Sequence, residues 1–213
     1  MSELGKYIVI EGNDGTGKST QVDLLAEWLA ERGESVQIVE EPGSGDPDKS
    51  TPIANELRSV IKNGSLERAP EINLTLFSAA RRELWREKIK PALGEGAIVL
   101  SARNYLSSLA YQGKGEGLDE NEIMRMTRLF TDDRYMNPDV MVVLTLDHQA
   151  RSERIAKRGD LANPDTFESR GGDFQNKVNA AYVEIANERG LSMIDASGTV
   201  EEVQQKIRHI IPM

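Results

Sequence analysis

The stretch from Tyr7 to Thr20 reads YIVIEGNDGTGKST and decides the fold. A short apolar run at 7–10 precedes a glycine-rich loop, and residues with the spacing of an amphipathic helix follow. The loop, GNDGTGKS at 12–19, fits G-x-x-x-x-G-K-[S/T], in which backbone N–H groups and a helix N-terminus surround phosphate oxygens. The stretch therefore predicts a strand, a phosphate-binding loop and a helix.

This loop is expected to bind a nucleoside triphosphate. Lys18 would reach the terminal phosphates, and the Ser19 hydroxyl would be a ligand of Mg²⁺. A turn without a ligand is the alternative, but it needs no lysine and hydroxyl at fixed positions where a helix begins. The pattern leaves the phosphoryl acceptor open, because motors, GTPases, transporters and small kinases share it. The expected contacts are Gly12, Asn13, Asp14, Gly15, Thr16, Gly17, Lys18, Ser19 and Thr20.

Composition narrows the protein class. A length of 213 residues suits one domain. The formal net charge of -9 argues against general electrostatic binding of a nucleic acid polymer. The chain has no cysteine, which fits a reducing compartment, and no apolar run approaches the roughly 20 residues of a membrane span. We therefore expect a cytoplasmic protein that acts on small molecules and does not bind membranes.

Short apolar runs alternate with helical patterns along the whole chain. Strands are expected at 7–10, 36–39, 97–100, 140–146 and 191–194. Helical connections between them predict parallel pairing. The run at 140–146 is the longest, and it is the candidate for a central strand buried on both faces. We predict a three-layer α/β fold, with a five-stranded parallel sheet between helices, as a single domain over residues 1–213.

The connections between the strands carry further signals. Pro70 is expected to open a helix over 71–90, with Ile72, Leu76, Phe77 and Leu84 on one face. Residues 106–111 should be helical, 112–117 should form a glycine-broken loop, and Asp119 should cap the next helix. The loop at 44–50 could either touch a ligand or be a solvated connection.

A basic helix comes before a stretch, 159–164, that fits neither helix nor strand. The helix carries Arg151, Arg154, Lys157 and Arg158 in an acidic chain. This local reversal of charge predicts a mobile lid at about 151–172 that closes over the triphosphate. A charged, solvated helix is the alternative.

Four motifs stand in one order: the phosphate loop, EPG at 41–43, FSAAR at 77–81 and AYQG at 110–113. With this combination the chain resembles the thymidylate kinase family of P-loop nucleoside monophosphate kinases, from Tyr7 to the closing helix. The resemblance implies that ATP phosphorylates dTMP with Mg²⁺ and that the protein is a homodimer joined through apolar helix faces. The alternatives are a kinase for another deoxynucleoside monophosphate and a nucleotide-binding protein with little transfer activity.

The resemblance also implies an acceptor site. Phe77 would stack on thymine, and Arg81 would hydrogen-bond the base. Arg58 and Arg103 would hold the acceptor phosphate. The other implied substrate contacts are Asp14, Glu41, Pro42, Ser108, Tyr111 and Gln112, while Ala196 and Ser197 would border adenine on the donor side.

The source of one catalytic cation is a first departure from the family pattern. The phosphate loop contains no arginine, so the lid would have to supply one beside Lys18 and Arg103. Arg158 is the first candidate and Arg170 the second. The lid also departs from the family pattern, in which an arginine is expected near the position of Thr166.

Ala102 is the second departure, because the family usually has aspartate immediately before Arg103. That aspartate helps to organise Mg²⁺. Glu11 or Asp14 could replace it, or the metal ion could rely on the phosphates and Ser19, or the enzyme could be slow. The sequence leaves these possibilities open.

Overall fold

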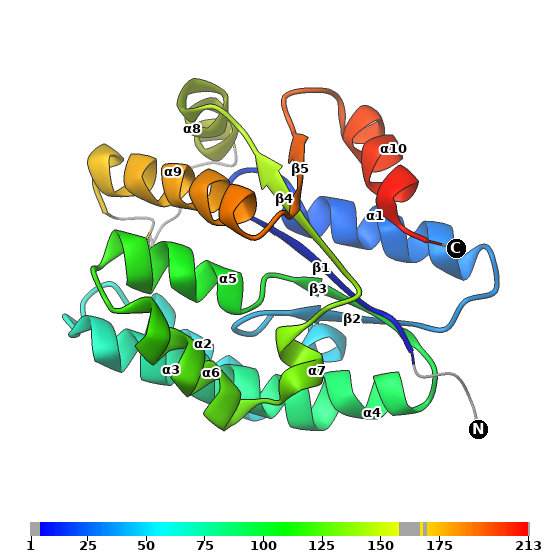
Figure 1. Ribbon diagram of the computed structural model, residues 1–213, viewed down its shortest axis with the longest axis horizontal. Coiled ribbons are helices and arrows are strands. Elements are labelled where there is room, and N and C mark those ends of the chain that lie inside the picture. Colours follow the sequence, from blue (N-terminus) through cyan, green and yellow to red (C-terminus); the bar gives the residue numbers. More distant parts are fainter. Residues whose placement is uncertain (1–4, 158–166, 168–169, 213) are drawn as a thin grey trace.

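The structure is a computed structural model that describes residues 5–157, 167 and 170–212 (Figure 1). In this part of the chain, five parallel strands form one sheet in the order β2-β3-β1-β4-β5. Helices cover both faces of the sheet, so the predicted three-layer α/β fold is confirmed. The strands are β1 (Tyr7–Gly12), β2 (Val36–Glu40), β3 (Ile98–Ala102), β4 (Val140–Thr145) and β5 (Ser192–Asp195).

The central strand is β1, which pairs with β3 on one side and β4 on the other. All six of its residues are buried. The run at 140–146 forms β4, an interior strand between β1 and β5 that is buried on both faces as predicted, although β1 is the middle strand of the five. A long apolar run indicates that a strand is buried on both faces. The order of the strands in the sheet depends instead on the crossover connections between them.

Alternating side chains of β1 build two apolar cores. Tyr7 and Val9 point into the core that α3 (Pro70–Leu84), α5 (Tyr105–Ser108) and α9 (Gly172–Glu188) cover. Ile8 and Ile10 point into the core that α1 (Lys18–Ala30) and α10 (Val200–Ile210) cover, on the opposite side of the sheet (Figure 1). Both cores thus meet at the strand that ends in the phosphate loop.

Most helices agree with the sequence pattern, and the predicted Asp119 cap is confirmed, because its carboxylate accepts hydrogen bonds from the N–H groups of Asn121 and Glu122. None of the described helices has the length and apolar content of a membrane span. Their bounds are α1 (Lys18–Ala30), α2 (Pro52–Lys62), α3 (Pro70–Leu84), α4 (Lys90–Gly94), α5 (Tyr105–Ser108), α6 (Glu120–Phe130), α7 (Asp133–Met136), α8 (His148–Lys157), α9 (Gly172–Glu188) and α10 (Val200–Ile210), with a short 3-10 turn at Pro47–Lys49.

The helix predicted over 71–90 is longer and less regular than expected. After α3 it passes through a π-helical turn, Trp85–Ile89, and continues into α4. Leu84 is buried as expected, but Ile72 is 51% exposed. The core-facing side of α3 is centred on other residues, Leu74 and Ala80 among them, because apolar residues occur all around this helix.

The loop expected at 112–117 is also different, since a π-helical segment, Leu109–Gly115, covers most of it. Its Tyr111 ring packs against Phe174 and Tyr182 of α9, with centroids 6.4 and 6.3 Å apart. Glycine content is a weak local preference, and packing against a neighbouring helix overrides it here. The segment holds Tyr111 and Gln112 against the cleft described below.

Candidate active site

The phosphate loop connects β1 to α1 and lies tightly against β4. Gly12 has φ +141, and a Cβ atom there would lie 2.4 Å from the Leu144 carbonyl oxygen. Lys18 Nζ and Thr16 Oγ1 donate to the Asn13 carbonyl oxygen, at 3.0 and 2.8 Å. The loop is therefore closed on itself, with Lys18 folded back over it.

The first turn of α1 faces a cleft. Gly17 occupies the N-cap position without any side-chain cap, so free N–H groups and the positive end of the helix dipole point at this space. Ser19 and Thr20 are exposed on the cleft wall beside Lys18. These are the features that bind phosphate groups at helix N-termini.

The structure brings the predicted acceptor residues to the same cleft, whose volume is about 230 Å³. Arg81 contacts the wall through Glu41 and Ser108. The part of 44–50 that could have touched a ligand does not line this cleft. The predicted residues on the wall are Asp14, Glu41, Pro42, Arg58, Phe77, Arg103, Ser108, Tyr111 and Gln112.

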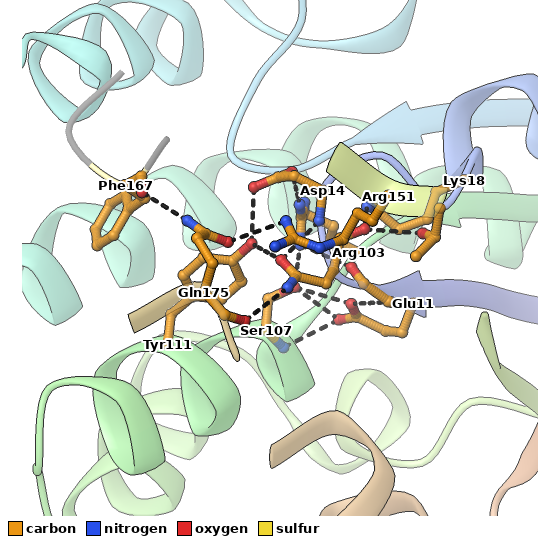
Figure 2. A network of polar contacts seen from close by, with 12 residues as sticks. Glu11, Asp14, Lys18, Arg103, Ser107, Tyr111, Arg151, Phe167 and Gln175 are labelled. Atoms are coloured by element: carbon orange, nitrogen blue, oxygen red, sulfur yellow. Dashed lines mark hydrogen bonds and ion pairs between the residues drawn. The ribbon is translucent and has the colours of Figure 1, made fainter. Parts of the chain in front are cut away.

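Arg103 lies directly on the phosphate loop. Its φ of 78° is rare for a residue other than glycine, and its guanidinium pairs with Asp14. Nη1 donates to the Gly12 carbonyl oxygen at 3.3 Å and to the Tyr182 hydroxyl at 3.1 Å. Arg103 is thus anchored to the phosphate loop (Figure 2).

The side chains of Glu11 and Arg103 share two hydrogen-bond partners, the hydroxyls of Ser107 and Tyr182. The Glu11 side chain is fully buried. Oε1 accepts hydrogen bonds from the N–H groups of Asn104 and Ser107, at 2.7 and 3.1 Å. Oε2 accepts from the hydroxyls of Ser107 and Tyr182, at 2.8 and 3.2 Å (Figure 2). Both carboxylate oxygens are committed to the protein, so Glu11 does not replace the aspartate missing at Ala102.

The Asp14 carboxylate is also engaged by protein groups. Besides the Arg103 pair, it accepts a hydrogen bond from the Tyr111 hydroxyl at 2.7 Å. Burial alone would raise the pKa of Asp14, but the charges of Arg103 and Lys18 outweigh it and hold the pKa well below the usual value. Asp14 therefore remains ionised and fixes both Arg103 and the Tyr111 ring.

Arg81 is held by a buried carboxylate. Its Nε donates to Glu41 Oε2 at 3.1 Å, and the Tyr135 hydroxyl donates to the other oxygen. Burial raises the pKa of Glu41, although Arg81 opposes this shift. Among the described residues, Arg81 Nη1 and Gln112 Nε2 are buried without a hydrogen-bond partner. Glu41 thus positions Arg81 behind the cleft wall, whereas Gln112 lines the wall itself.

Three aromatic rings meet in the cleft, of which the sequence predicted two. Phe167 is 5% exposed, and its ring centroid lies 5.7 Å from that of Phe77 and 5.6 Å from that of Tyr111. Its carbonyl oxygen accepts a hydrogen bond from Gln175 Nε2 at 2.7 Å (Figure 2). A lone aromatic residue in a polar lid sequence was the available signal for this contact.

The lid arginines differ in what they contact. Arg158 lies outside the described residues. Arg170 pairs with Glu116 at 2.6 Å and lies over the ring of Phe174, 4.6 Å from its centroid. Both therefore remain predictions as catalytic residues, and the structure draws attention to a third arginine.

Arg151 of α8 lies on the phosphate loop, and it is 3% exposed. A Cβ atom at Gly15 would lie 3.1 Å from Arg151 Cγ. Nη1 donates to Gln175 Oε1 at 3.3 Å, whereas Nε is buried without a partner. Sequence reasoning placed Arg151 on the basic helix but did not single it out, because its contact with the loop depends on how α8 packs.

The residues expected beside adenine follow β5. The Ala196 carbonyl oxygen accepts a hydrogen bond from Arg154 Nη2 at 2.7 Å, and the Ser197 hydroxyl donates to Asp195 at 2.8 Å. Because β5 and β1 are parallel strands of one sheet, these residues and the phosphate loop lie at the same edge.

Comparison with known proteins identifies the family. The family model described as "Thymidylate kinase" matches residues 10–207. The chain belongs to the thymidylate kinase family. It is 34% identical to the thymidylate kinase of Rhodopirellula baltica, with 97% of this chain and 80% of that protein covered. It is also 34% identical to that of Halothermothrix orenii, with 96% and 95% covered.

The fold agrees with this assignment. A crystal structure of thymidylate kinase from Ehrlichia chaffeensis matches with a TM-score of 0.76 and 26% sequence identity, over 99% of both chains. The thymidylate kinases are transferases, so the cleft described above is a candidate active site for phosphoryl transfer.

A pH-dependent contribution to stability follows from the depressed pKa of Asp14. This contribution is complete above the unfolded-state pKa of about 3.9 and is lost as pH falls through the lower folded-state value. We expect Asp14→Asn to lower the free energy of unfolding by about 2 kcal/mol at neutral pH, because two hydrogen bonds to a charged group are weakened. Urea unfolding should show this difference shrinking below about pH 4. A difference that grows with acidity would contradict the assignment.

Proposed function

We propose that this thymidylate kinase family member transfers the γ-phosphoryl group of ATP to dTMP, giving dTDP and ADP. One observation carries the proposal. Lys18 and Arg103 both donate to carbonyl oxygens of the phosphate loop, those of Asn13 and Gly12, while both side chains line one cleft. A donor and an acceptor phosphate bound there would face each other across these two cations.

We further propose a single cytoplasmic domain over residues 1–213, which remains a prediction from the sequence.

The acceptor half of the cleft has the chemistry that thymine requires. The two unpartnered donors, Arg81 Nη1 and Gln112 Nε2, suit the carbonyl oxygens of that base, and Phe77 offers a ring for stacking. The Tyr111 hydroxyl is tied to Asp14 at 2.7 Å, so its ring is fixed where the deoxyribose would pack. Arg58 lines the same wall and is proposed to hold the acceptor phosphate together with Arg103.

Mg²⁺ fits the donor half. Ser19 offers a hydroxyl oxygen, a ligand that Mg²⁺ accepts, on the exposed first turn of α1. Mg²⁺ commonly keeps several waters and binds substrate phosphates with few protein ligands, which suits this site. When bound, the ion would neutralise charge on the phosphates of ATP. The residues proposed to border the rest of ATP are those of the loop, with Ala196 and Ser197 beside adenine.

Positioning and charge account for the proposed catalysis. Phosphoryl transfer needs little covalent help from protein, so its rate depends on alignment of the two substrates and on cations around the transferred group. The Arg103 guanidinium is held on the loop, because it pairs with Asp14 and donates a hydrogen bond to the Gly12 carbonyl oxygen. A further hydrogen bond, to the Tyr182 hydroxyl, ties it to α9. The acceptor phosphate it holds would therefore keep a fixed direction relative to ATP.

The direct test is formation of dTDP from dTMP and MgATP. We expect turnover by the unsubstituted protein and a loss of at least about 100-fold in Lys18→Ala, because a cation beside the transferred group is removed. Rates with dTMP, dUMP, dCMP, dGMP and AMP measure the preference for the base.

Two results would favour the alternatives. A clear preference for a purine would overturn dTMP as the substrate. Binding of both nucleotides with no product above the Lys18→Ala control would favour a nucleotide-binding protein without useful transfer, for which Ala102 is the structural reason.

We propose that Arg151 on α8 is the arginine that contacts the transferred phosphoryl group. Its stem packs on Gly15, its guanidinium donates only to the neutral Gln175 amide within the described residues, and it forms no ion pair there. A buried cation is stabilised by an anion. The γ-phosphate of ATP on the loop would supply that anion.

Arg151→Met keeps the length of the stem and removes the charge. We expect kcat to fall about 100-fold, while the KM for dTMP stays within about threefold, since one stabilising donor is lost from the transition state. Arg170→Met is the matched control, and Arg158→Met tests the remaining lid candidate. If Arg151→Met keeps full kcat and another of these variants loses it, the cation is not Arg151.

A homodimer is proposed from exposed apolar side chains on α2, α3 and α6. Ile53, Ile72 and Leu129 on these helices are 55%, 51% and 69% exposed. Helix α3 packs against both α2 and α6, and exposed large apolar side chains on neighbouring helices are candidates for an interaction site. Family resemblance supports a second copy of the chain as the partner.

Ile72→Asp should disrupt this dimer, because a charge would be buried in an apolar interface. Light scattering after size-exclusion chromatography should give a dimer for the unsubstituted protein and a monomer for the variant. Val200→Asp, at an exposed apolar position on α10, is the control and should leave the dimer intact. A monomeric unsubstituted protein at micromolar concentration would exclude the dimer.

A further inference from the structure

The carboxylate missing at Ala102 has one available substitute in the cleft. Three carboxylates line the wall among the described residues: Asp14, Glu40 and Glu41. Asp14 is engaged by Arg103 and Tyr111, and Glu41 by Arg81 and Tyr135. Glu40 is the member of this set without a cationic partner in the described part of the chain.

Glu40 is the neighbour of Ala102 across the sheet. It is the last residue of β2, and its Cα atom is paired with that of Ala102 at the end of β3. Paired residues of adjacent strands point to the same face of a sheet, and the strands are about 4.8 Å apart. Val36 and Ile38 of β2 pack into the core that α1 covers, so alternation directs Glu40 to that same face.

This face is where α1 begins, with Lys18 and Ser19 on the cleft wall. The glutamate side chain is one methylene longer than that of aspartate, so Glu40 can extend over the space that a carboxylate at 102 would occupy. Ala102 provides no carboxylate of its own, because its side chain ends at Cβ. The position of Glu40 beside Ala102, the face of the sheet to which it points and the length of its side chain therefore all suit a residue that replaces the missing aspartate.

The Glu40 carboxylate is half-buried and only weakly engaged. The Ser44 hydroxyl donates to Oε2 at 3.1 Å. The nearby cation Lys49 is paired with Asp23 at 2.6 Å. Within the described residues, Oε1 therefore accepts no hydrogen bond from a side chain and remains available to a ligand in the cleft.

We propose that Glu40 is the acidic residue of the magnesium site, which it contacts through water ligands of the ion. Ser19 and the phosphates of ATP would bind the ion directly, as Mg²⁺ commonly keeps several waters. The inference rests on the proposed function of the cleft, and it explains how a family member can lack the aspartate before Arg103. A carboxylate on the neighbouring strand takes its place.

The test uses Mn²⁺ in place of Mg²⁺, with a non-hydrolysable ATP analogue and full-length protein. Electron paramagnetic resonance measures free Mn²⁺, and so its affinity for the enzyme–nucleotide complex. Glu40→Gln should weaken this affinity about 10-fold, the effect expected when a carboxylate that orients the ligands of a metal ion is lost. Glu27→Gln, at an exposed position of α1, is the control and should have no effect.

A rescue variant separates the metal site from a folding defect. Adding Ala102→Asp to Glu40→Gln should restore the Mn²⁺ affinity to within about threefold of the starting value, because either carboxylate serves the same space. Unchanged affinity in Glu40→Gln overturns the proposal, and so does a loss that Ala102→Asp fails to restore.

The two proposals fail independently. If the unsubstituted protein forms dTDP but Glu40→Gln binds Mn²⁺ normally, the magnesium assignment is wrong and the kinase function stands. If no dTDP forms but Glu40→Gln still weakens Mn²⁺ binding and the rescue succeeds, the metal site is correct and the proposed transfer is wrong.

Discussion

The buried carboxylate of Glu11 joins three parts of the active site at one point. It sits at the end of the central strand and accepts hydrogen bonds from the backbone before α5 and from Tyr182 of α9. A carboxylate removed from water is tolerated only when such donors replace the lost hydration. The phosphate loop, the Arg103 segment and α9 are therefore fixed relative to one another. The distance between the two proposed substrate positions would depend on this contact.

The cleft combines cationic side chains on its wall with carboxylates that hold arginines in place. The chain as a whole is acidic, with a formal net charge of -9, yet Lys18, Arg58 and Arg103 line one wall. Local clustering of cations can bind phosphates even when the protein repels polyanions in general. Internal carboxylates hold two arginines in place, Asp14 holding Arg103 on the wall and Glu41 holding Arg81 behind it. The acidic composition and a phosphate-binding site are thus compatible.

Sequence reasoning reached the features that are local in the chain. The phosphate loop follows from the backbone conformations that its glycines allow, as at Gly12, and the strands follow from apolar runs. The family resemblance implied that distant residues such as Phe77 and Arg103 share one site, and both line the cleft. Other contacts between distant segments were not accessible. The pairing of Glu40 with Ala102 depends on strand register, and the contact of Arg151 with Gly15 depends on helix packing. The apolar run of β4 indicated burial correctly, but it carried no information about strand order.

The central claim is that one cleft aligns a donor and an acceptor phosphate across Lys18 and Arg103. A crystal structure with adenosine and thymidine joined by a chain of phosphates tests it most directly. The account predicts thymine against Phe77, with Lys18 and the Arg103 guanidinium both within hydrogen-bond distance of the phosphate chain. Thymidine bound outside the Phe77 cleft, or a phosphate chain that contacts only one of these two cations, would contradict it.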